Sequence, residues 1–325
     1  MLKSRLFMGL AIMLLPAAVL AAAAQPFPTH PIRLIVPYPP GGPTDLVGRT
    51  VNELLARRLG QPVVVDNRGG AATVIGTELA ARAPADGYTL LVATVTTLAV
   101  NPAISAKLPY DAARDFVPIS MLAVQPYLLG VHASVPATSV AQLVAYAKAN
   151  PGKLSFASAG VGAGAHLAGE MFKYMAAIDV VHVPYKGTGP ALNDLIGGQV
   201  SYMFGGISAI YPHTQNGKLR ALAVSSAKRS PAVPEIPTVA EGGLAGYGTT
   251  SWNSLVAPRG TPQAIIDRLN AEVNVVFAQP EVKERLKRQG IDADPGTQEQ
   301  LAAHIQSEQA RFRQLVKTIG LTGVE

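Results

Sequence analysis

Residues 32–94 alternate between short apolar runs and helical patterns, and this alternation limits the possible folds more than any other feature. Residues 32–36 are rich in β-branched side chains, and apolar residues then recur at helical spacing as far as Gly60. The pattern continues with an apolar run at 62–66, an Ala-rich helical stretch at 73–83 and another run at 89–94. Such alternation is typical of a doubly wound parallel sheet, whose ligand sites open at the carboxyl ends of strands.

A long apolar run at 119–131 indicates a strand that passes from this first domain into a second one. Strand and helix patterns alternate again from 140 to 225, a return strand is predicted at 251–257, and the chain from Thr261 onward is predicted to be helical. We therefore expect two α/β domains, each with a doubly wound, mostly parallel sheet, joined by two crossing strands. Domain 1 would comprise 25–125 and 251–325, and domain 2, inserted into it, 126–250.

Residues 1–24 are predicted to be a secretory signal peptide. Lys3 and Arg5 precede an apolar segment at 7–20, and small residues end at Ala24, the expected cleavage site. The alternative, a membrane anchor, would require a longer apolar segment. The chain contains no cysteine, which excludes thiolate metal sites and Cys nucleophiles. We expect a soluble periplasmic protein, and a monomer because no coiled-coil pattern is sustained.

The formal charge of +6 is mild and spread along the chain. Its densest basic spots are Arg57-Arg58 and the segment 283–288, where lysines and arginines alternate with glutamates. Nucleic-acid binding requires a basic stripe or aromatic stacking platforms, and the sequence has neither. The charge therefore favours small anions as partners rather than nucleic acid.

The turn between the first strand and the first helix has an unusual composition. Pro39 and Pro40 restrict φ, whereas Gly41 and Gly42 permit backbone angles and close approaches that a Cβ would prevent. Pro43 suits the first helical position, where its missing N–H costs nothing. Such a turn directs unpaired N–H groups and the positive end of the helix dipole at open space. It is either an anion-binding cradle or simply a well-formed turn.

A second glycine-rich turn lies in the predicted second domain. Gly160, Gly162 and Ala165 match G-x-G-x-x-A between a strand and a helix, a pattern found in dinucleotide-binding sites. That function also requires an acidic residue at the end of the next strand, but Asp179 precedes this strand. We therefore favour a general anion cradle over a dinucleotide site, with simple packing as the alternative, and predict no cofactor.

The remaining candidate side chains each have two interpretations. Asp45, at the third helical position, either contacts a ligand or favours the helix dipole, and Lys186, beside Tyr185, either pairs with an anion or is solvated. His166 either orients a ligand or is a structural histidine. The sequence contains no G-x-S-x-G elbow or H-E-x-x-H motif, and its histidines lack metal-ligand spacing, so no catalytic or metal site is predicted.

Taken together, these motifs resemble the substrate-binding proteins of tripartite tricarboxylate transporters, the Bug family. The resemblance covers essentially the whole mature chain, and its residues lie at 36–45, 86–89, 182–187, 197–200, 217–224, 237–242 and 257–262. It implies a periplasmic-binding-protein clamshell (Venus flytrap) that captures a small organic anion, a carboxylate, between its domains and delivers it to a membrane permease. Family members tend to hold the carboxylate with backbone groups and bridging waters in place of an arginine.

The candidate ligand-binding residues combine the resemblance with the turns and side chains above. They are Tyr38, Pro40, Gly41, Gly42, Asp45, Thr94, Ser158, Ala159, Gly160, Gly162, His166, Tyr185, Lys186 and Gly205.

This chain departs from the family pattern in two places. The usual Asn-Arg-Pro-Gly-Ala-Gly-Gly segment is replaced at 67–73 by Asn-Arg-Gly-Gly-Ala-Ala-Thr. Acidic residues that many relatives carry are replaced by Ser201 and Gly205, which disfavours an amino-acid ligand because its ammonium would lack a negative partner. Two rival functions stay open: an exported enzyme that uses the same cleft, and a sensor that presents its ligand-bound form to a signalling partner.

Overall fold

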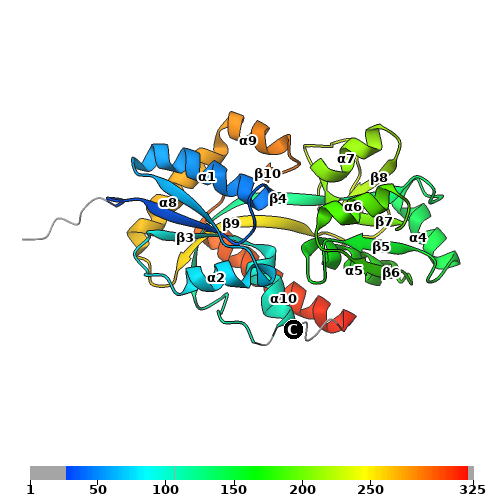
Figure 1. The fold of residues 1–325 in the computed structure, drawn as a ribbon, viewed down its shortest axis with the longest axis horizontal. Helices are drawn as coiled ribbons and strands as arrows, with labels where there is room; N and C mark the ends of the chain where they lie inside the picture. Colours follow the sequence, from blue (N-terminus) through cyan, green and yellow to red (C-terminus); the bar gives the residue numbers. More distant parts are fainter. Residues whose placement is uncertain (1–26, 106, 321–325) are drawn as a thin grey trace, which may run out of the picture.

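The computed structural model describes residues 27–105 and 107–320, so the predicted signal peptide at 1–24 lies outside the described residues. Two lobes stand side by side, and two long strands run between them (Figure 1). Within the described part of the chain, no helix combines the length and the apolar composition that crossing a bilayer requires.

The first lobe is built on a sheet with both faces covered. Its strand order is β2 (Val63–Asn67), β1 (Ile32–Val36), β3 (Thr89–Thr94), β9 (Thr250–Pro258) and β4 (Phe116–His132). Strand β1 pairs in parallel with β2 and β3, as the alternating sequence predicts, whereas β9 is antiparallel to both β3 and β4. The result is a mixed sheet that is parallel at one edge.

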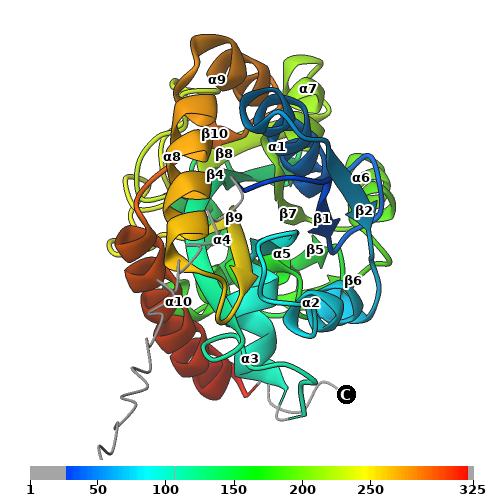
Figure 2. The ribbon, with the colours of Figure 1, turned by 90° about the vertical axis from the view of Figure 1, so that its left-hand side faces the viewer.

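Helices pack on the two faces of this sheet (Figure 2). One face carries α1 (Pro43–Leu59), α8 (Gln263–Ala278) and α9 (Pro280–Lys287). The other carries α2 (Val74–Ala81), η2 (Thr96–Val100), α3 (Asn101–Ile104) and α10 (Gln298–Ile319). Within one strand, Leu90 faces the first set and Leu91 the second, which is why β3 is an almost unbroken apolar run.

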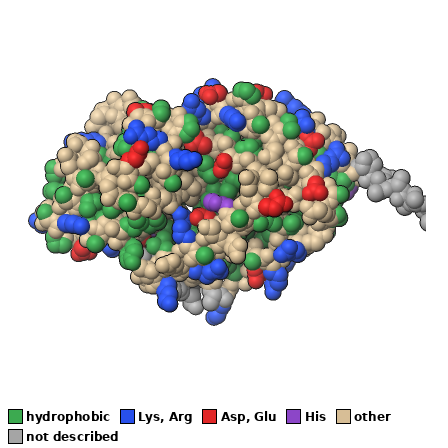
Figure 3. All heavy atoms as spheres, turned by 180° about the vertical axis from the view of Figure 1, so that it is seen from behind, with side chains coloured by type: hydrophobic (Ala, Val, Ile, Leu, Met, Phe, Trp, Pro, Cys, Tyr) green, Lys and Arg blue, Asp and Glu red, His purple; other side chains and the backbone are tan. Residues whose placement is uncertain are grey.

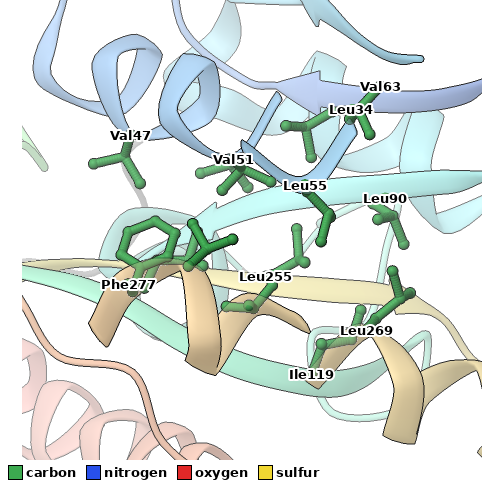
Figure 4. Close-up of a cluster of buried hydrophobic side chains, with 14 of the residues drawn as sticks. Leu34, Val47, Val51, Leu55, Val63, Leu90, Ile119, Leu255, Leu269 and Phe277 are labelled. Carbon is green, nitrogen blue, oxygen red and sulfur yellow. The ribbon is translucent and has the colours of Figure 1, made fainter. Parts of the chain in front are cut away.

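The larger core of this lobe lies between the sheet and the α1–α8 face (Figure 4). Val51 and Leu55 of α1 meet Leu255 of β9 and Leu269 of α8 there, and none of these side chains is more than 1% exposed. This packing fixes the beginning of α1 against the carboxyl end of β1.

The C-terminal part of the chain is not continuously helical, contrary to the sequence prediction from Thr261 onward. Helix α9 ends near Gly290, whose φ of +68° belongs to the left-handed region, and a short strand β10 (Asp292–Ala293) then pairs with β4 before α10 begins. Ile291 is buried between them. The backbone turn at Gly290 and the burial of Ile291 therefore override the helical propensity of the flanking sequence.

The second lobe repeats the plan on a smaller scale. Its strands are β5 (Ser155–Ser158), β6 (Val181–Pro184), β7 (Tyr202–Gly206) and β8 (Leu219–Val224), together with the end of β4. Strand β5 is parallel to β6 and β7, and β4 is antiparallel to β7 and β8. The helices are α4 (Val140–Ala149), α5 (Gly164–Ala176), α6 (Thr188–Ile196) and α7 (Ile207–Gln215).

Strand β4 belongs to both lobes. Its residues from Phe116 to Pro126 pair with β9, and those from Tyr127 to His132 pair with β7 and β8. Strand β9 enters the first lobe beside it, with Thr250 opposite Pro126. The junction is therefore two adjacent extended segments, an arrangement that permits the lobes to move about a short hinge.

The loop after β2 holds a strained backbone. Ala71, Ala72 and Thr73 have φ values of 45°, 49° and 79°, in the left-handed region that residues with a Cβ rarely occupy. The carbonyl of Ala72 accepts a hydrogen bond of 2.8 Å from Asn101 Nδ2, which holds the loop in place. Glycine occupies positions 72 and 73 in the family pattern, so this chain retains a glycine conformation without the glycines.

Replacing Ala72 by glycine should therefore stabilise the protein. Relief of the left-handed strain contributes about 1–2 kcal/mol, and the extra entropy of the unfolded chain subtracts about 0.4–1 kcal/mol, so a net gain of about 0.5–1 kcal/mol is expected. Urea unfolding measures it. The matched control is Ala302→Gly on the exposed face of α10, which should lose about 1 kcal/mol. If Ala72→Gly and Ala302→Gly lose the same free energy of unfolding, the backbone at Ala72 is not strained.

Candidate functional site

The carboxyl ends of strands from both lobes open on the junction, where Figure 3 shows the surface hollowed between the lobes. From the first lobe come the β1–α1 turn at 37–42 and the end of β3 at Thr94. From the second come the β5–α5 loop at 159–163 and the β6–α6 loop at 185–187. The lobes touch here, because a Cβ on Gly162 would stand 3.2 Å from Ile104 Cδ1.

Asp45 organises the β1–α1 turn. Its Oδ2 accepts hydrogen bonds from Gly41 N at 2.9 Å and Arg49 Nε at 2.8 Å, and its Oδ1 accepts one from Asn67 Nδ2 at 2.9 Å. Burial would raise the pKa of this carboxyl, but the bonds from Gly41, Arg49 and Asn67 outweigh it and hold the pKa below its usual range. Asp45 is 3% exposed, and both of its oxygens are bonded within the lobe.

The same bonds determine what the two glycines of this turn do. Gly41 has φ +91°, and its N–H points at Asp45 rather than at open space. Gly42 is the N-cap of α1, with no side chain capping this helix end in the described structure, and the first helical bond is from Leu46 N to Gly42 O. The N–H groups of Thr44 and Asp45 therefore precede the helical ladder and carry the positive end of the dipole. Pro40 is exposed beside them.

Tyr38 and Thr94 lie together at the base of this turn. Tyr38 Oη is 3.3 Å from Thr94 Oγ1, which is in turn 3.0 Å from Thr97 Oγ1. Thr94 is buried, whereas Tyr38 is partly exposed. Two residues that lie 56 positions apart in the chain thus have adjacent hydroxyl groups.

Tyr127, at the point where β4 changes lobes, faces this pair and was missed by the sequence analysis. Burial raises the pKa of its hydroxyl, and the nearby Tyr38 adds to the rise. A Cβ on Gly164 would overlap Tyr127 Oη, so only glycine fits at the first residue of α5. In the sequence, Tyr127 is one apolar residue in a long strand-like run, and nothing in the pattern tells which of these side chains faces a site.

The β5–α5 loop is held by its own hydrogen bonds. Gly160 N donates to Ser158 Oγ at 3.2 Å, and Gly162 N donates to His166 Nδ1 at 3.1 Å, while the carbonyl of Ala159 accepts from Gly187 N at 3.1 Å. Gly160 and Gly162 have φ +134° and +78°, which explains why both are glycines. Their N–H groups are therefore bonded within the protein, like that of Gly41.

The N-terminus of α5 supplies the open donors instead. The first helical bond is from Leu167 N to Ala163 O at 3.1 Å, and no side chain in the described structure caps this end. The N–H groups of Gly164, Ala165 and His166 thus lie ahead of the helical ladder. Together with the start of α1, they give the junction two uncapped helix N-termini, one from each lobe, each suited to an anion.

His166 and His182 form a stacked pair behind this loop. Their ring centroids are 4.0 Å apart at 25°, His166 is 2% exposed, and Ser158 Oγ lies 2.7 Å from His182 Nε2. Because His166 Nδ1 accepts from Gly162 N–H, the proton of the neutral ring is assigned to Nε2. His166 is therefore buried and positions the glycine-rich loop through this bond.

Glu170 completes a cluster whose composition could suit a metal ion, since polar atoms of Glu170, His166 and His182 lie within 4.8 Å of one another. The geometry does not suit coordination. The lone pairs of an imidazole lie in the plane of its ring, so two nearly parallel stacked rings cannot direct them at one ion. The nitrogens that face the loop are also already bonded to Gly162 and Ser158.

The 2.7 Å contact between Ser158 and His182 is a serine–histidine pair that the motif search did not reveal. Ser158 is fully buried, and its hydroxyl is also within 3.1 Å of the Gly160 carbonyl. This hydroxyl donates to the Gly160 carbonyl and accepts from Gly160 N–H, so its bonds tie it to its own loop. The pair therefore shapes the loop.

The last three candidates are less central. Tyr185 Oη donates to Asp194 Oδ2 at 2.6 Å, and Lys186 is exposed at the edge of the loop. Gly205 is buried, and a Cβ there would stand 2.8 Å from Ile210 Cδ1, so this glycine allows close packing of α7. The structure thus brings the candidates of the first lobe together around the start of α1. It brings those from Ser158 to His166 together around the start of α5, and Gly205 packs against α7.

The stacked histidines should make stability depend on pH. Burial lowers the pKa of both His166 and His182 to about 4. The neighbouring charge of His182 adds to the lowering at His166, and that of Lys173 to the lowering at His182. In the unfolded chain histidine titrates near pH 6.5, so between about pH 6.5 and 4 the unfolded chain binds more protons. As the pH is lowered through this window, the free energy of unfolding should therefore fall, by about 3 kcal/mol for one such histidine.

Melting temperatures recorded from pH 7 to pH 4 check this expectation. His182→Phe keeps an aromatic ring in the stack but removes one titrating group, so its melting temperature should fall less steeply with acidification. His30→Phe is the control, because His30 is exposed and lies outside the cluster. If His182→Phe and the unmodified protein follow parallel curves, the pair is not the source of the pH dependence.

Comparison with known proteins identifies the family. The model of the tripartite tricarboxylate transporter family receptor matches residues 47–321. BugT of Bordetella pertussis is 38% identical over 319 residues, which cover 98% of both chains. The solved structure of R. palustris Rpa4515 with adipate is 37% identical, with a TM-score of 0.81, and covers 90% of this chain and 98% of that one. MatC (Rpa3494) from Rhodopseudomonas palustris with bound malate is 34% identical, with a TM-score of 0.76, and covers 89% and 100%.

These likenesses confirm the predicted two-domain periplasmic-binding-protein fold and the resemblance to the Bug proteins. The chain belongs to the tripartite tricarboxylate transporter receptor family, a family of solute-binding proteins.

Proposed function

We propose that this protein binds a small dicarboxylate between its lobes and delivers it to the membrane permease of a tripartite tricarboxylate transporter. One observation carries the proposal: the uncapped N-termini of α1 and α5 open on the same junction from opposite lobes. Each offers N–H groups and a dipole end to one carboxylate. The solved relatives that hold adipate and malate support this ligand class.

The hydroxyl groups between the two helix ends complete the proposed site. Tyr38 and Thr94 belong to the first lobe and Tyr127 to the start of the second, so a ligand that spans them contacts both lobes. Such a ligand stabilises the closed arrangement by its differential affinity for it. The closed receptor then presents a surface that the permease can distinguish from the open one.

The remaining parts of the proposal concern location and chemistry. We place the mature protein in the periplasm as a monomer, after removal of residues 1–24, because that segment has the composition of a signal peptide. We assign it no enzymatic activity, because the hydroxyl of Ser158 is bonded within its own loop and the family is one of solute-binding receptors. The membrane permease is its expected partner.

Ligand binding tests the proposal directly. Calorimetry with adipate, succinate, malate and citrate should detect binding of at least one of them, with the dissociation constant in the micromolar range or below. Small-angle scattering of the same samples should show a more compact particle in the presence of the binding ligand. Failure of all four carboxylates to bind would overturn the proposed function, and binding without compaction would overturn the closure.

A substitution of Asp45 separates positioning from direct contact. Asp45→Asn places an amide NH₂ among the donors of Gly41, Arg49 and Asn67, so it should cost about 1–3 kcal/mol of stability. Because the turn that carries Tyr38 loosens as well, affinity should fall by about tenfold, or roughly 1.4 kcal/mol.

The control for Asp45→Asn is Asp267→Asn, which changes an exposed carboxylate on α8 that accepts from Gln263 and Gln298. Its stability should change by less than about 0.5 kcal/mol, and its affinity should not change. If Asp45→Asn keeps full stability but loses all binding, then Asp45 contacts the ligand directly and is not a positioning residue.

A further inference from the structure

A buried carboxamide in the crossing strand β9 lacks a partner. Asn253 is 1% exposed, and none of the residues that the structure describes offers a hydrogen bond to its Oδ1. A buried polar atom without a partner destabilises the folded state, so native proteins rarely keep one without a purpose. If the carboxamide is rotated by half a turn about its Cβ–Cγ bond, Nδ2 takes the place of Oδ1, and the buried polar atom at this place still lacks a hydrogen-bond partner.

The position of Asn253 connects it with the proposed ligand site. In the sheet it stands opposite Thr94 of β3, and paired residues of antiparallel strands project from the same face. Thr94 is the residue whose hydroxyl lies 3.3 Å from Tyr38 Oη. The carboxamide is thus a direct neighbour of the hydroxyl pair at the base of the β1–α1 turn.

The second crossing strand contributes another buried amide on this face. Asn253 also stands opposite Ala123 of β4, and Gln125 is two residues further along β4, hence on the same side. Gln125 is 6% exposed, and a Cβ on Gly206, at the start of α7, would stand 3.4 Å from its Nε2. Asn253 and Gln125 therefore form an amide floor where the two crossing strands leave the first lobe.

The chemistry of this floor distinguishes between ligands. An ionised carboxylate only accepts hydrogen bonds, so it satisfies the carboxamide only when Nδ2, and not Oδ1, is turned toward it. A hydroxyl group both donates and accepts, so it satisfies the carboxamide in either orientation. An ammonium would also donate, but the nearest acid of the turn, Asp45, is already bonded to Arg49.

We propose that Asn253 is a specificity-determining residue that accepts a hydrogen bond from a hydroxyl group of the ligand. The preferred ligands are then hydroxylated di- or tricarboxylates. This inference rests on the proposed function, because it names the class of carboxylate that the same site selects.

Matched pairs of ligands that differ by one hydroxyl group test the inference. Malate is compared with succinate, and citrate with tricarballylate, by calorimetry on the unmodified protein and on Asn253→Leu. The unmodified protein should bind the hydroxylated member of a pair about tenfold more tightly. Asn253→Leu should reduce this ratio to about one, mainly by weakening the hydroxylated ligand.

Thermal melting without ligand provides an independent readout. Leucine keeps the branched shape of asparagine and has no polar atom to leave unpaired, so Asn253→Leu should melt at the same or a higher temperature. The control is Asn270→Leu on α8, whose amide donates to the carbonyls of Ile119 and Gly296. That variant should melt at a lower temperature and keep the preference for the hydroxylated ligand.

Each result decides the inference. The inference is overturned if Asn253→Leu still binds the hydroxylated member of a pair more tightly. If the melting temperature of this variant is also raised, the partner of the carboxamide is an internal water. A melting temperature lowered as far in Asn253→Leu as in Asn270→Leu also overturns it, because the carboxamide of Asn253 is then as well bonded in the folded protein as that of Asn270. Equal binding of both members of each pair to the unmodified protein overturns the hydroxyl preference but leaves carboxylate binding intact. If none of these four ligands binds, the inference fails, and if adipate does not bind either, the proposed function fails with it.

Discussion

The antiparallel pairing of β4 with β9 is the constraint on which the rest of the structure depends. It is the place where the chain passes from one lobe into the other and back, so the sheets on both sides are anchored to it. Gln125 and Asn253 lie within this pairing, and Tyr127 follows it directly on β4. Two hydrogen-bonded strands resist sliding along each other, but they bend where few hydrogen bonds join them. The β4–β9 pair can therefore both carry residues of a site and act as its hinge.

In the proposed site, the donors offered to an anion belong mainly to the backbone. The N–H groups of Gly41, Gly160 and Gly162 are bonded to side chains of their own lobes, and this fixes the loops that precede α1 and α5. The open donors are the first N–H groups of the helices themselves. Rigid loops preceding uncapped helices allow an anion to be bound without reorganisation, and the buried Asp45 and His166 provide that rigidity from behind.

Sequence reasoning located both glycine-rich turns between a strand and a helix, but it did not anticipate which atoms their N–H groups meet. It identified the β1–α1 and β5–α5 turns because Pro and Gly at strand ends leave a clear local signal. It could not distinguish an N–H that faces a ligand from one that faces Asp45 or His166, because that depends on the side chain's rotamer. It also treated Gly205 as a site residue, whereas the structure places Ile210 against it.

The sequence by itself determined the alternation of strands and helices, the parallel pairing around β1 and the positions of both glycine-rich turns. These follow from local periodicity and from φ restrictions, which each segment carries within itself. Only the tertiary structure decided that Tyr127 stands against Gly164, that Ser158 meets His182, and that Asn253 lies beside Thr94 without a partner of its own. Such contacts join residues far apart in the chain, and the register of the sheet, rather than any local pattern, brings them together.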